Sequence, residues 1–494
     1  MAGIQAFGGY VPRLRLPRRA ISGAVSWFNP GLEALARGER AFASWDEDSI
    51  TLAVEAARDC LVSRSRAGIG RISLASTTLP NADRQNSTVV KEALNLSDDI
   101  AAFDVAGSQR GGTSSLLDAF YAAAGGAGPV LCITAERGRH RSGSEAELVA
   151  GHAAAAMLVG PGDGAARFLG AHSVTLDFVD HFRAAGERFD YSWEARWVRD
   201  EGYAKIVPAA LKVALAKSGV GPSEVDHFVM PAPLKGVNAN VAKLAGIRPE
   251  AVADTLASQL GDAGCAQPLV MLSHVLERAG PNETIVVVGF GGGCDVIVLR
   301  TTADIADCRP ASGIVGSLAA RRPEESYIKF LAFSGLLELE KGMRAELDQK
   351  PILTALYRDR KTVLGLVGGK CRVSGNVQFP KSRISVSPGA RTVDTQEDYP
   401  LAERSARVIS FTADHLTYTP DPPAHYGTVE FEGGGRLMAD LVDIDEGELE
   451  VGLPVRMIFR IKALDERRGF TKYFWKATPD RRLSVTGRNE TAVA

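Results

Sequence analysis

A turn crowded with small residues, within Phe103–Leu117, is the stretch of this chain best suited to chemistry. An apolar strand is predicted before the turn and an apolar helix, 116–124, after it. Such a strand–turn–helix lifts one side chain into a cleft, at the positive end of a helix dipole. We expect the lifted side chain in this chain to be Gln109. Its amide donates and accepts hydrogen bonds but has no nucleophilic chemistry of its own.

A second candidate region is the segment 177–203, which is charged, aromatic and irregular. Such a segment is more typical of a cleft lining than of a core. His181 and Tyr203 are its candidate catalytic residues, with Tyr191 beside them. The alternative is a surface network of ion pairs, whose other members would be Arg183, Glu187, Arg199 and Asp200.

Length and composition describe a globular protein of two or three domains. The chain has 494 residues, of which 45% are hydrophobic and 23% charged. Its formal net charge of −2 gives no reason to expect nucleic-acid binding, and no apolar run reaches membrane-spanning length. The N-terminus carries no signal-peptide pattern, and the six cysteines show no pairing spacing. We therefore expect reduced thiols, a cytoplasmic location and no membrane partner.

The elements that must position these residues alternate between strand and helix over the first 300 residues. The predicted strands are 72–76, 128–135, 153–159, 227–230, 283–290 and 294–299, and the predicted helices are 50–57, 87–94, 207–218, 238–245 and 268–278. Two rounds of β-α-β-α-β of this kind indicate an α/β fold.

This first part resembles the hydroxymethylglutaryl-CoA synthase and ketoacyl synthase III-like branch of the thiolase superfamily. The family's nucleophile turn reads Asp-x-x-x-Ala-Cys-x-Gly-Gly-Thr, and Asp104, Gly111, Gly112 and Thr113 match it. The family's acylated Cys falls on Gln109. The resemblance implies a duplicated five-layered fold, an acyl-CoA thioester as substrate and a homodimer or a higher symmetric oligomer.

The same resemblance locates the family's other catalytic positions. Its proton-moving Glu falls on Thr77, its His on Pro231, and the Asn of its Gly-Asn-Thr on Asp262. The family's three residues of acyl transfer, its Cys, Glu and His, are thus all replaced, by Gln109, Thr77 and Pro231. Asp262, on a turn that faces the cleft in the family, becomes the best-placed acid or base; the alternative is a cap on the helix predicted from Pro268.

The resemblance also implies residues that contact the substrate or CoA. The family's late glycine turn, here Gly291 and Gly292, would let backbone N–H groups approach a thioester oxygen. The complete predicted set is Thr77, Arg110, Gly111, Gly112, Pro231, Gly291 and Gly292.

The rest of the chain resembles the DUF35-type zinc-ribbon and OB-fold proteins associated with acyl-CoA enzymes. In these, two pairs of cysteines hold zinc. Here Cys371 keeps one sulfur, its mate is Ser374, and the second pair falls near Ser385 and Ser387 or Pro388. One thiolate cannot hold a structural zinc, so we expect a metal-free ribbon and no bound cofactor.

Five alternating strands after the ribbon indicate a small all-β OB barrel: 408–416, 426–431, 436–443, 455–462 and 470–476. The expected domains are a thiolase-like domain (1–302), a helical connector (303–350), a degenerate ribbon (351–392), an OB fold (393–480) and a flexible tail (481–494).

Three functions fit this pattern. The favoured one is an acyl-CoA enzyme that breaks a carbon–carbon bond without an acyl-enzyme, by retro-aldol or Claisen-type cleavage or by decarboxylation. The second is a non-catalytic acyl-CoA-binding or scaffolding partner of an active thiolase or synthase. The third is ordinary synthase-like acyl transfer through another thiol, for which Cys265 is the nearest candidate in sequence.

Overall fold

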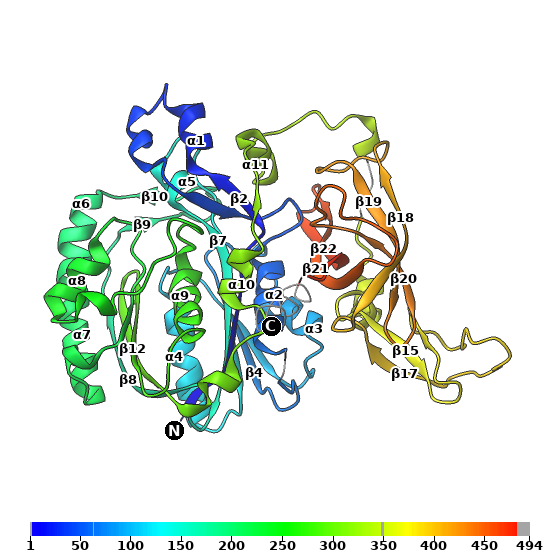
Figure 1. Cartoon of the computed structure of the whole chain (residues 1–494), viewed down its shortest axis with the longest axis horizontal. Helices are drawn as coiled ribbons and strands as arrows, with labels where there is room; N and C mark the ends of the chain where they lie inside the picture. The colour runs from blue at the N-terminus through cyan, green and yellow to red at the C-terminus, as the bar shows by residue number, and fades with distance from the viewer. Residues whose placement is uncertain (1, 63, 347–349, 482–494) are drawn as a thin grey trace, which may run out of the picture. The chain divides into compact units, whose positions relative to one another are not determined.

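The computed structural model describes residues 2–62, 64–346 and 350–481, which fall into two compact units (Figure 1). The first unit holds the chain up to Ser44 together with Asp48–Thr88 and Leu96–Leu337, and the second unit holds Trp45–Glu47, Val89–Asn95 and the chain from Glu338 onward. Most of the predicted tail, 482–494, lies outside the described residues.

A nine-stranded mixed sheet forms the frame of the first unit. In spatial order its strands are β11 (His227–Val229), β12 (Thr284–Phe290), β13 (Gly293–Thr301), β8 (Ala166–Thr175), β1 (Ala2–Tyr10), β7 (His152–Pro161), β6 (Val130–Arg137), β4 (Arg71–Ala75) and β5 (Ala101–Val105). Pairing is parallel at both ends of this order and antiparallel through the middle. Strands β6, β7 and β12 read as apolar runs because both of their faces are covered.

Helices cover both faces of the sheet and also fill the space between its two halves. Figure 1 shows α7 and α8 outside one half, α4 and α9 in the middle and α2 outside the other half. The layers α7/α8, strands, α4/α9, strands and α2 confirm the predicted thiolase-like α/β fold. The helices of this unit are α1 (Arg18–Val25), α2 (Ser49–Cys60), α4 (Gly111–Ala124), α5 (Glu145–Val149), α6 (Ala195–Trp197), α7 (Ala204–Ser218), α8 (Val237–Ala245), α9 (Gln267–Leu276), α10 (Gly313–Ala319) and α11 (Tyr327–Phe333).

Two small sheets and one helix complete the description of this part of the chain. The sheets are β14 (Arg322–Pro323), β2 (Leu14–Pro17) and β3 (Glu39–Phe42), and the hairpin of β9 (His181–Phe182) and β10 (Tyr191–Ser192). Helix α3 (Asn86–Ala93) runs from the first unit into the segment assigned to the second. No helix among the described residues is both long and apolar enough to span a lipid bilayer.

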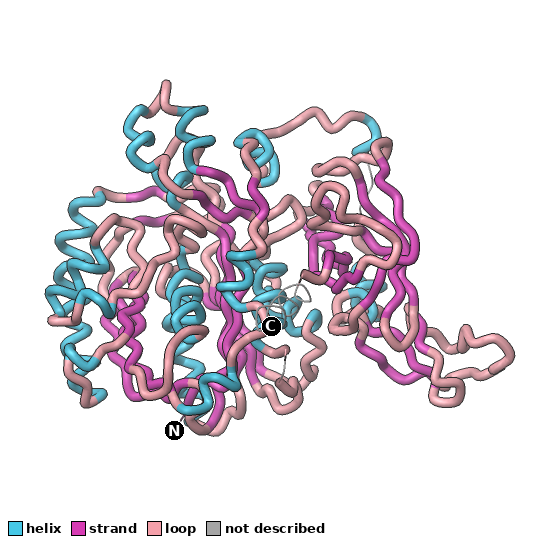
Figure 2. Tube along the Cα trace, viewed as in Figure 1, coloured by secondary structure: helices cyan, strands magenta, loops and turns pink. Residues whose placement is uncertain are grey.

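The second unit consists mostly of strands and loops (Figure 2). The ribbon sheet has the order β16 (Val377–Gln378), β15 (Val367–Cys371), β17 (Gln396–Pro400). The antiparallel barrel sheet has the order β20 (Arg436–Asp440), β19 (Ala424–Phe431), β18 (Ala406–Asp414), β21 (Pro454–Asp465), β22 (Phe470–Pro479), and two short helices, α12 (Leu353–Arg358) and α13 (Arg360–Val363), precede the ribbon. The five predicted barrel strands are confirmed.

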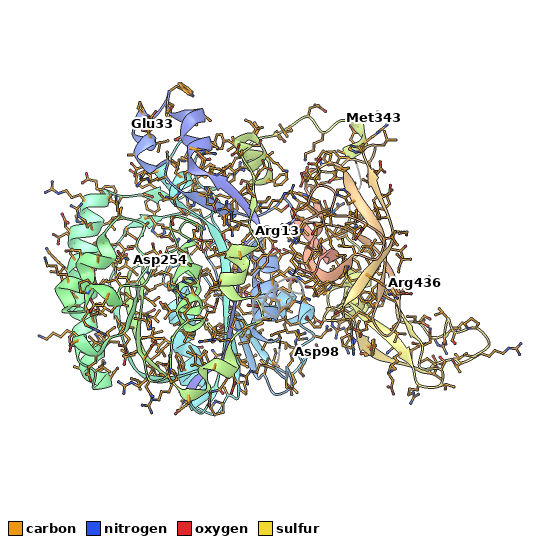
Figure 3. All side chains as sticks on the ribbon, in the orientation of Figure 1. Arg13, Glu33, Asp98, Asp254, Met343 and Arg436 are labelled. Carbon is orange, nitrogen blue, oxygen red and sulfur yellow. The ribbon has the colours of Figure 1, made fainter. Side chains whose placement is uncertain are left out.

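Buried charges pair inside the second unit. Lys476 Nζ lies 2.9 Å from Asp46 Oδ2 and 4.4 Å from the centre of the Trp45 ring, while Arg460 pairs with Glu47 and, at 2.7 Å, with Asp443. Each pairing matters because an uncompensated buried charge is costly. On the outside, exposed side chains carry both signs, such as Glu33, Asp254 and Arg436 (Figure 3), in keeping with the small net charge.

The ribbon has hydroxyl groups around its one cysteine. Cys371 Sγ lies 3.1 Å from Thr395 Oγ1 and 3.5 Å from Thr392 Oγ1, and it accepts the Ser374 N–H at 3.4 Å. Ser374 Oγ in turn lies 3.5 Å from Ser385 Oγ. A thiol with neutral hydroxyls does not fit tetrahedral zinc, and no group of three or more His, Cys, Asp or Glu side chains in the described ranges is placed to hold a metal.

Candidate active site

The turn that carries Gln109 is fixed to two neighbouring strands. Arg110 donates to the Val174 carbonyl (2.7 Å) and to Thr175 Oγ1 (3.0 Å) on β8. Ser108 Oγ donates to the Gly291 carbonyl (3.0 Å), in the turn between β12 and β13. Helix α4 then begins at Gly111, so Gln109 stands just before its N-terminus.

Gly291 lets these two turns touch. Its φ is +153°, and a Cβ on it would lie 3.2 Å from the Gln109 nitrogen and 3.0 Å from Ser108 Oγ. A glycine is therefore needed for the contact, as the family's late glycine turn implies. The glycine turn thus backs onto the main chain of Gln109.

The loop that carries Asp262 is anchored to the chain just before β7. Its backbone pairs with the chain before β7, with Gly151 N donating to Asp262 O (2.8 Å) and Asp262 N donating to Val149 O (2.8 Å). The side chain accepts the Gly264 N–H at 2.7 Å. Helix α9 has no side-chain hydrogen bond at its N-cap, so the predicted alternative, a cap made by Asp262, is wrong.

Gly264 is where the polar side chains meet. A Cβ on Gly264 would lie 2.7 Å from Gln109 Oε1 and 3.5 Å from Glu136 Cγ, and its N–H is held by Asp262. We call Gln109, Glu136 and Asp262 around Gly264 the polar centre. Here the structure brings together two residues that the sequence analysis proposed and one that it missed.

The missed residue is Glu136, at the end of β6. It is 3% exposed and accepts hydrogen bonds from Thr77 N and Thr77 Oγ1 (both 3.1 Å) and from Thr78 Oγ1. Burial raises the pKa of Glu136 to about 7 in spite of these bonds. Thr77, where the family's Glu falls, thus holds a carboxylate that a different strand supplies. A charged residue closing an apolar strand was the signal available in the sequence.

Burial also shifts the pKa values of two residues that the sequence analysis did predict, Asp262 and Tyr203. It raises the pKa of Asp262 to about 6, while the Gly264 N–H opposes the shift. Tyr203 is 5% exposed and stacks on Phe290 with ring centres 4.1 Å apart. Burial, followed by the charges of Asp180 and Asp262, raises the pKa of Tyr203, so its phenol stays neutral.

His181 stands beside Gln109. The two Nε2 atoms lie 3.4 Å apart, and His181 Nδ1 lies 3.2 Å from Asp180 Oδ2. Burial alone would lower the pKa of His181, but the hydrogen bond and charge of Asp180 raise it above the usual value. Nδ1–H can donate to Asp180, which leaves Nε2 facing the Gln109 amide.

The amide oxygen of Gln109 is buried, and no donor among the described residues satisfies it. An unsatisfied buried acceptor costs about 1–3 kcal/mol. Native proteins carry few such atoms, and those that they retain call for a functional explanation. The polar centre is therefore poised to accept a hydrogen bond that the fold itself does not supply.

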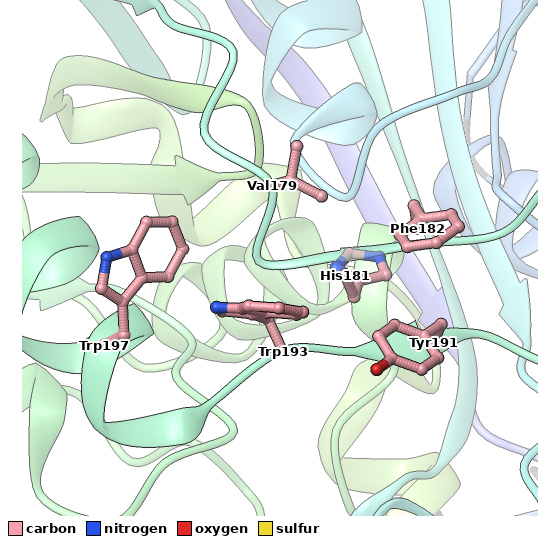
Figure 4. A pocket seen from close by; sticks show the side chains of 6 residues that line it. All are labelled: Val179, His181, Phe182, Tyr191, Trp193 and Trp197. Carbon is pink, nitrogen blue, oxygen red and sulfur yellow. The ribbon is translucent and has the colours of Figure 1, made fainter.

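A pocket adjoins His181 in the segment 177–203. Its volume is about 380 Å³, and Figure 4 shows the side chains that line it: Val179, His181, Phe182, Tyr191, Trp193 and Trp197. The prediction that this segment lines a cleft is confirmed. Ion pairs are present in the same segment, Arg183 with Asp190 (2.8 Å) and Arg199 with Asp200 (2.8 Å). These charged residues do not line the pocket.

The remaining predicted residues lie at the ends of the surrounding elements. Gly111 and Gly112 begin α4, and a Cβ on Gly112 would lie 2.5 Å from the Cys265 carbonyl, so this glycine allows close packing. Gly292 accepts the Leu176 N–H (3.2 Å), and Pro231 follows β11. Their roles toward a substrate stay predictions, as does that of Arg110.

Cys265 is the thiol next to the polar centre. It is fully buried, and a Cβ on Gly111 would lie 3.3 Å from its sulfur. Burial, helped by the charge of Glu136, raises the pKa of Cys265 well above its usual value. The thiolate that a nucleophile needs is thus disfavoured.

Comparisons with known proteins match the two units of the chain to different families. The family model of the 3-oxoacyl-[acyl-carrier-protein] synthase III C terminal matches residues 215–299, and that of the ChsH2 C-terminal OB-fold domain matches residues 399–460. The hydroxymethylglutaryl-CoA synthase of Aeropyrum pernix is 29% identical over 348 residues, 69% of this chain and 96% of that protein. That of Pyrococcus horikoshii is 31% identical over 298 residues, 59% of this chain and 83% of that protein.

Solved structures agree on the fold. A hydroxymethylglutaryl-CoA synthase in complex with CoA superposes with a TM-score of 0.58 at 16% identity, over 71% of this chain and 94% of its own. OleA of Xanthomonas campestris superposes with a TM-score of 0.54 at 19% identity, over 60% of this chain and 98% of its own.

Proposed function

The chain belongs to the hydroxymethylglutaryl-CoA synthase family, and from that premise we propose that it acts on an acyl-CoA thioester without forming an acyl-enzyme. The reaction would break the carbon–carbon bond between the α and β carbons of the acyl group. One observation supports the proposal: position 109, where the resemblance places the acylated Cys, holds an amide, and two carboxyls of near-neutral pKa lie with it around Gly264.

A retro-aldol cleavage of a β-hydroxyacyl-CoA needs only those groups. A base takes the proton of the β-hydroxyl, the Cα–Cβ bond breaks, and its electron pair moves to Cα and the thioester oxygen as an enolate. An aldehyde or ketone leaves. An acid then protonates Cα, giving a shorter acyl-CoA. Loss of CO₂ from a carboxylate attached to Cα would give the same kind of enolate without the first proton transfer.

The two carboxyls suit the two proton transfers. Burial raises the pKa of Asp262 to about 6 and that of Glu136 to about 7, so both carboxyls can exchange a proton near neutral pH. We assign the base to Asp262, which lies in the turn that the resemblance places at the cleft, and the acid to Glu136.

Gln109 would stabilise the enolate. The amide N–H that does not face His181, together with the adjacent N-terminus of α4, presents positive charge where the thioester oxygen becomes negative. His181, held by Asp180, orients the amide through its Nε2. The backbone contact at Gly291 keeps the turn in place.

The test is a panel of β-hydroxyacyl-CoAs and of acyl-CoAs that carry a carboxylate on Cα, with release of a shorter thioester followed by mass spectrometry. We expect turnover by the wild type and a loss of about 100-fold or more in Asp262→Asn. Asp83→Asn, an exposed carboxyl on the surface, is the matched control and should keep full activity. Turnover by Asp262→Asn at the wild-type rate would contradict the assignment.

A second function is favoured by the same amide: a non-catalytic acyl-CoA-binding partner of a thiolase or synthase, because a carboxamide cannot be acylated as a thiolate is. CoA binding without turnover of any panel member would support it. An acyl adduct on Cys265 would instead support ordinary acyl transfer. The homodimer implied by the resemblance and the cytoplasmic location expected from the sequence stay predictions, and light scattering of the purified protein tests the first.

A further inference from the structure

Aromatic side chains are unusually exposed beside the polar centre. Phe182, Tyr191 and Trp193 are 52%, 57% and 55% exposed and together wall the pocket next to His181. Exposed apolar groups gathered in one patch mark a binding surface more often than a structural feature. Because they line a half-open pocket of about 380 Å³ rather than a flat face, a small ligand suits them better than a protein surface does.

The rings are held in place before any ligand arrives. In the hairpin β9/β10, Phe182 pairs with Tyr191 and His181 with Ser192, and the Phe182 and Tyr191 ring centres lie 5.5 Å apart. Trp193 N donates to the Asp180 carbonyl at 3.0 Å. The ion pair of Arg183 and Asp190 closes the hairpin. A site whose walls are fixed costs little entropy to occupy.

A stack of rings joins the pocket to the floor of the site. Trp197 stacks on Phe178 with ring centres 4.2 Å apart, and Phe178 meets the edge of Phe290 at 5.9 Å. Phe290 directly precedes Gly291, which backs onto Gln109. The pocket wall and the catalytic turn are thus parts of one packed set.

His181 both lines the pocket and contacts Gln109 of the polar centre. In Figure 4 it lies between Val179 and Phe182 on one side and Tyr191 and Trp193 on the other, while its Nε2 lies 3.4 Å from the Gln109 amide. A thioester whose carbonyl lies at Gln109 would therefore extend its acyl group past His181 into the pocket.

We propose that this aromatic pocket binds the acyl group of the substrate, and that this group is bulky, apolar and contains a ring. The proposal rests on the proposed function, since it assumes a thioester at Gln109. The pocket volume falls in the range that takes drug-sized ligands, and an acetyl group would fill little of it. Flat rings stack on flat rings, and the pocket offers few polar groups to a charged or hydroxylated chain.

Binding rather than turnover tests the pocket. The probes are 2-naphthylacetyl-CoA and acetyl-CoA, titrated into the full chain by calorimetry. We expect the naphthyl thioester to bind about 10-fold or more tightly, because ring stacking and apolar burial act on it alone. Trp193→Ala should remove most of that preference, whereas Trp193→Phe should retain part of it. Trp27→Ala, an exposed Trp outside the pocket, is the matched control.

The outcomes separate this proposal from the proposed function. A ring preference without turnover keeps the pocket and overturns the proposed cleavage. Turnover with equal affinity for both thioesters keeps the cleavage and overturns the pocket. If Trp193→Ala changes the oligomeric state and not the ring preference, the aromatic patch is a contact between copies of the chain and the proposal is wrong.

Discussion

The Gln109 turn and the ribbon around Cys371 are two places where the resemblance aligns cysteines of the family patterns with other residues of this chain. In the ribbon, hydroxyls of Thr392 and Thr395 lie against the remaining thiol, and Ser374 contacts it through its N–H. At the turn, the amide oxygen of Gln109 is buried without a donor among the described residues.

The difference shows that the loss of sulfur can have two results. The ribbon replaces its ligands with groups that satisfy one another, so a ligand would gain little there. The polar centre keeps an unsatisfied acceptor and two carboxyls, Glu136 and Asp262, whose raised pKa values record an unfavourable environment for charge. Buried polar groups left in that state are available to a substrate.

The largest expected effect is on Gln109. Gln109→Ala should lower turnover by about 100-fold or more, as removal of an oxyanion donor does. The free energy of unfolding should stay the same or rise, because an unsatisfied buried acceptor is removed. Thioester release and urea unfolding measure the two quantities. A loss of stability without a loss of turnover would make Gln109 a structural residue like those of the ribbon.

Glu136 gives a pH-dependent effect on stability. Its pKa is about 7 in the folded chain against an ordinary value of 4.5, so the folded state holds the proton more tightly. The stabilisation from the protonated form is complete below about pH 4.5 and lost as pH rises through 7. Relative to wild type, Glu136→Gln should therefore gain about 1–3 kcal/mol in unfolding free energy between pH 4.5 and 8.

Urea unfolding at both pH values measures this change, with the surface variant Glu187→Gln as control. The amide fits the site, because its oxygen can accept from Thr77 and its NH₂ faces the Thr78 hydroxyl. An unfolding free energy of Glu136→Gln that follows wild type at every pH would show that burial does not perturb this carboxyl.

Gly264→Ala probes how tightly the polar centre is closed. The added Cβ would lie 2.7 Å from Gln109 Oε1, on a backbone with φ of +49°. We expect about 1–2 kcal/mol of destabilisation together with reduced turnover. Gly219→Ala is the control: its φ is +65° and open space surrounds it, so this variant measures the cost of backbone strain without a side-chain clash. Equal losses of turnover in the two variants would contradict the contact with Gln109.

The smallest effect is expected in the ribbon. Cys371→Ser should shift the urea unfolding midpoint less than any variant above, because a hydroxyl can take the place of the sulfur among the Ser and Thr groups around it. A chelator should leave the unfolding midpoint unchanged. A midpoint that falls on chelation would reveal a bound metal and remove the contrast between the two regions.

Much of the fold followed from local patterns. Apolar runs predicted the buried strands β6, β7 and β12, and alternation with glycine punctuation predicted the barrel strands, because burial on two faces or on one leaves a distinct period in the sequence. The Asp-x-x-x turn motif placed Gln109, and composition marked 177–203 as a cleft lining. The ends of the strands could not be predicted from these patterns, and neither could the division of the predicted connector, 303–350, between the two units after Leu337. Both depend on packing.

What the sequence determined alone is the identity of the groups at each position: an amide at 109, a carboxylate at 262, one sulfur in the ribbon. Only the tertiary structure decided their surroundings. Glu136 reaches the polar centre because β6 lies beside β4 and ends next to Thr77, a pairing of residues 59 positions apart. The raised pKa values arise from burial among distant segments, and no pattern along the chain records how much water those segments exclude.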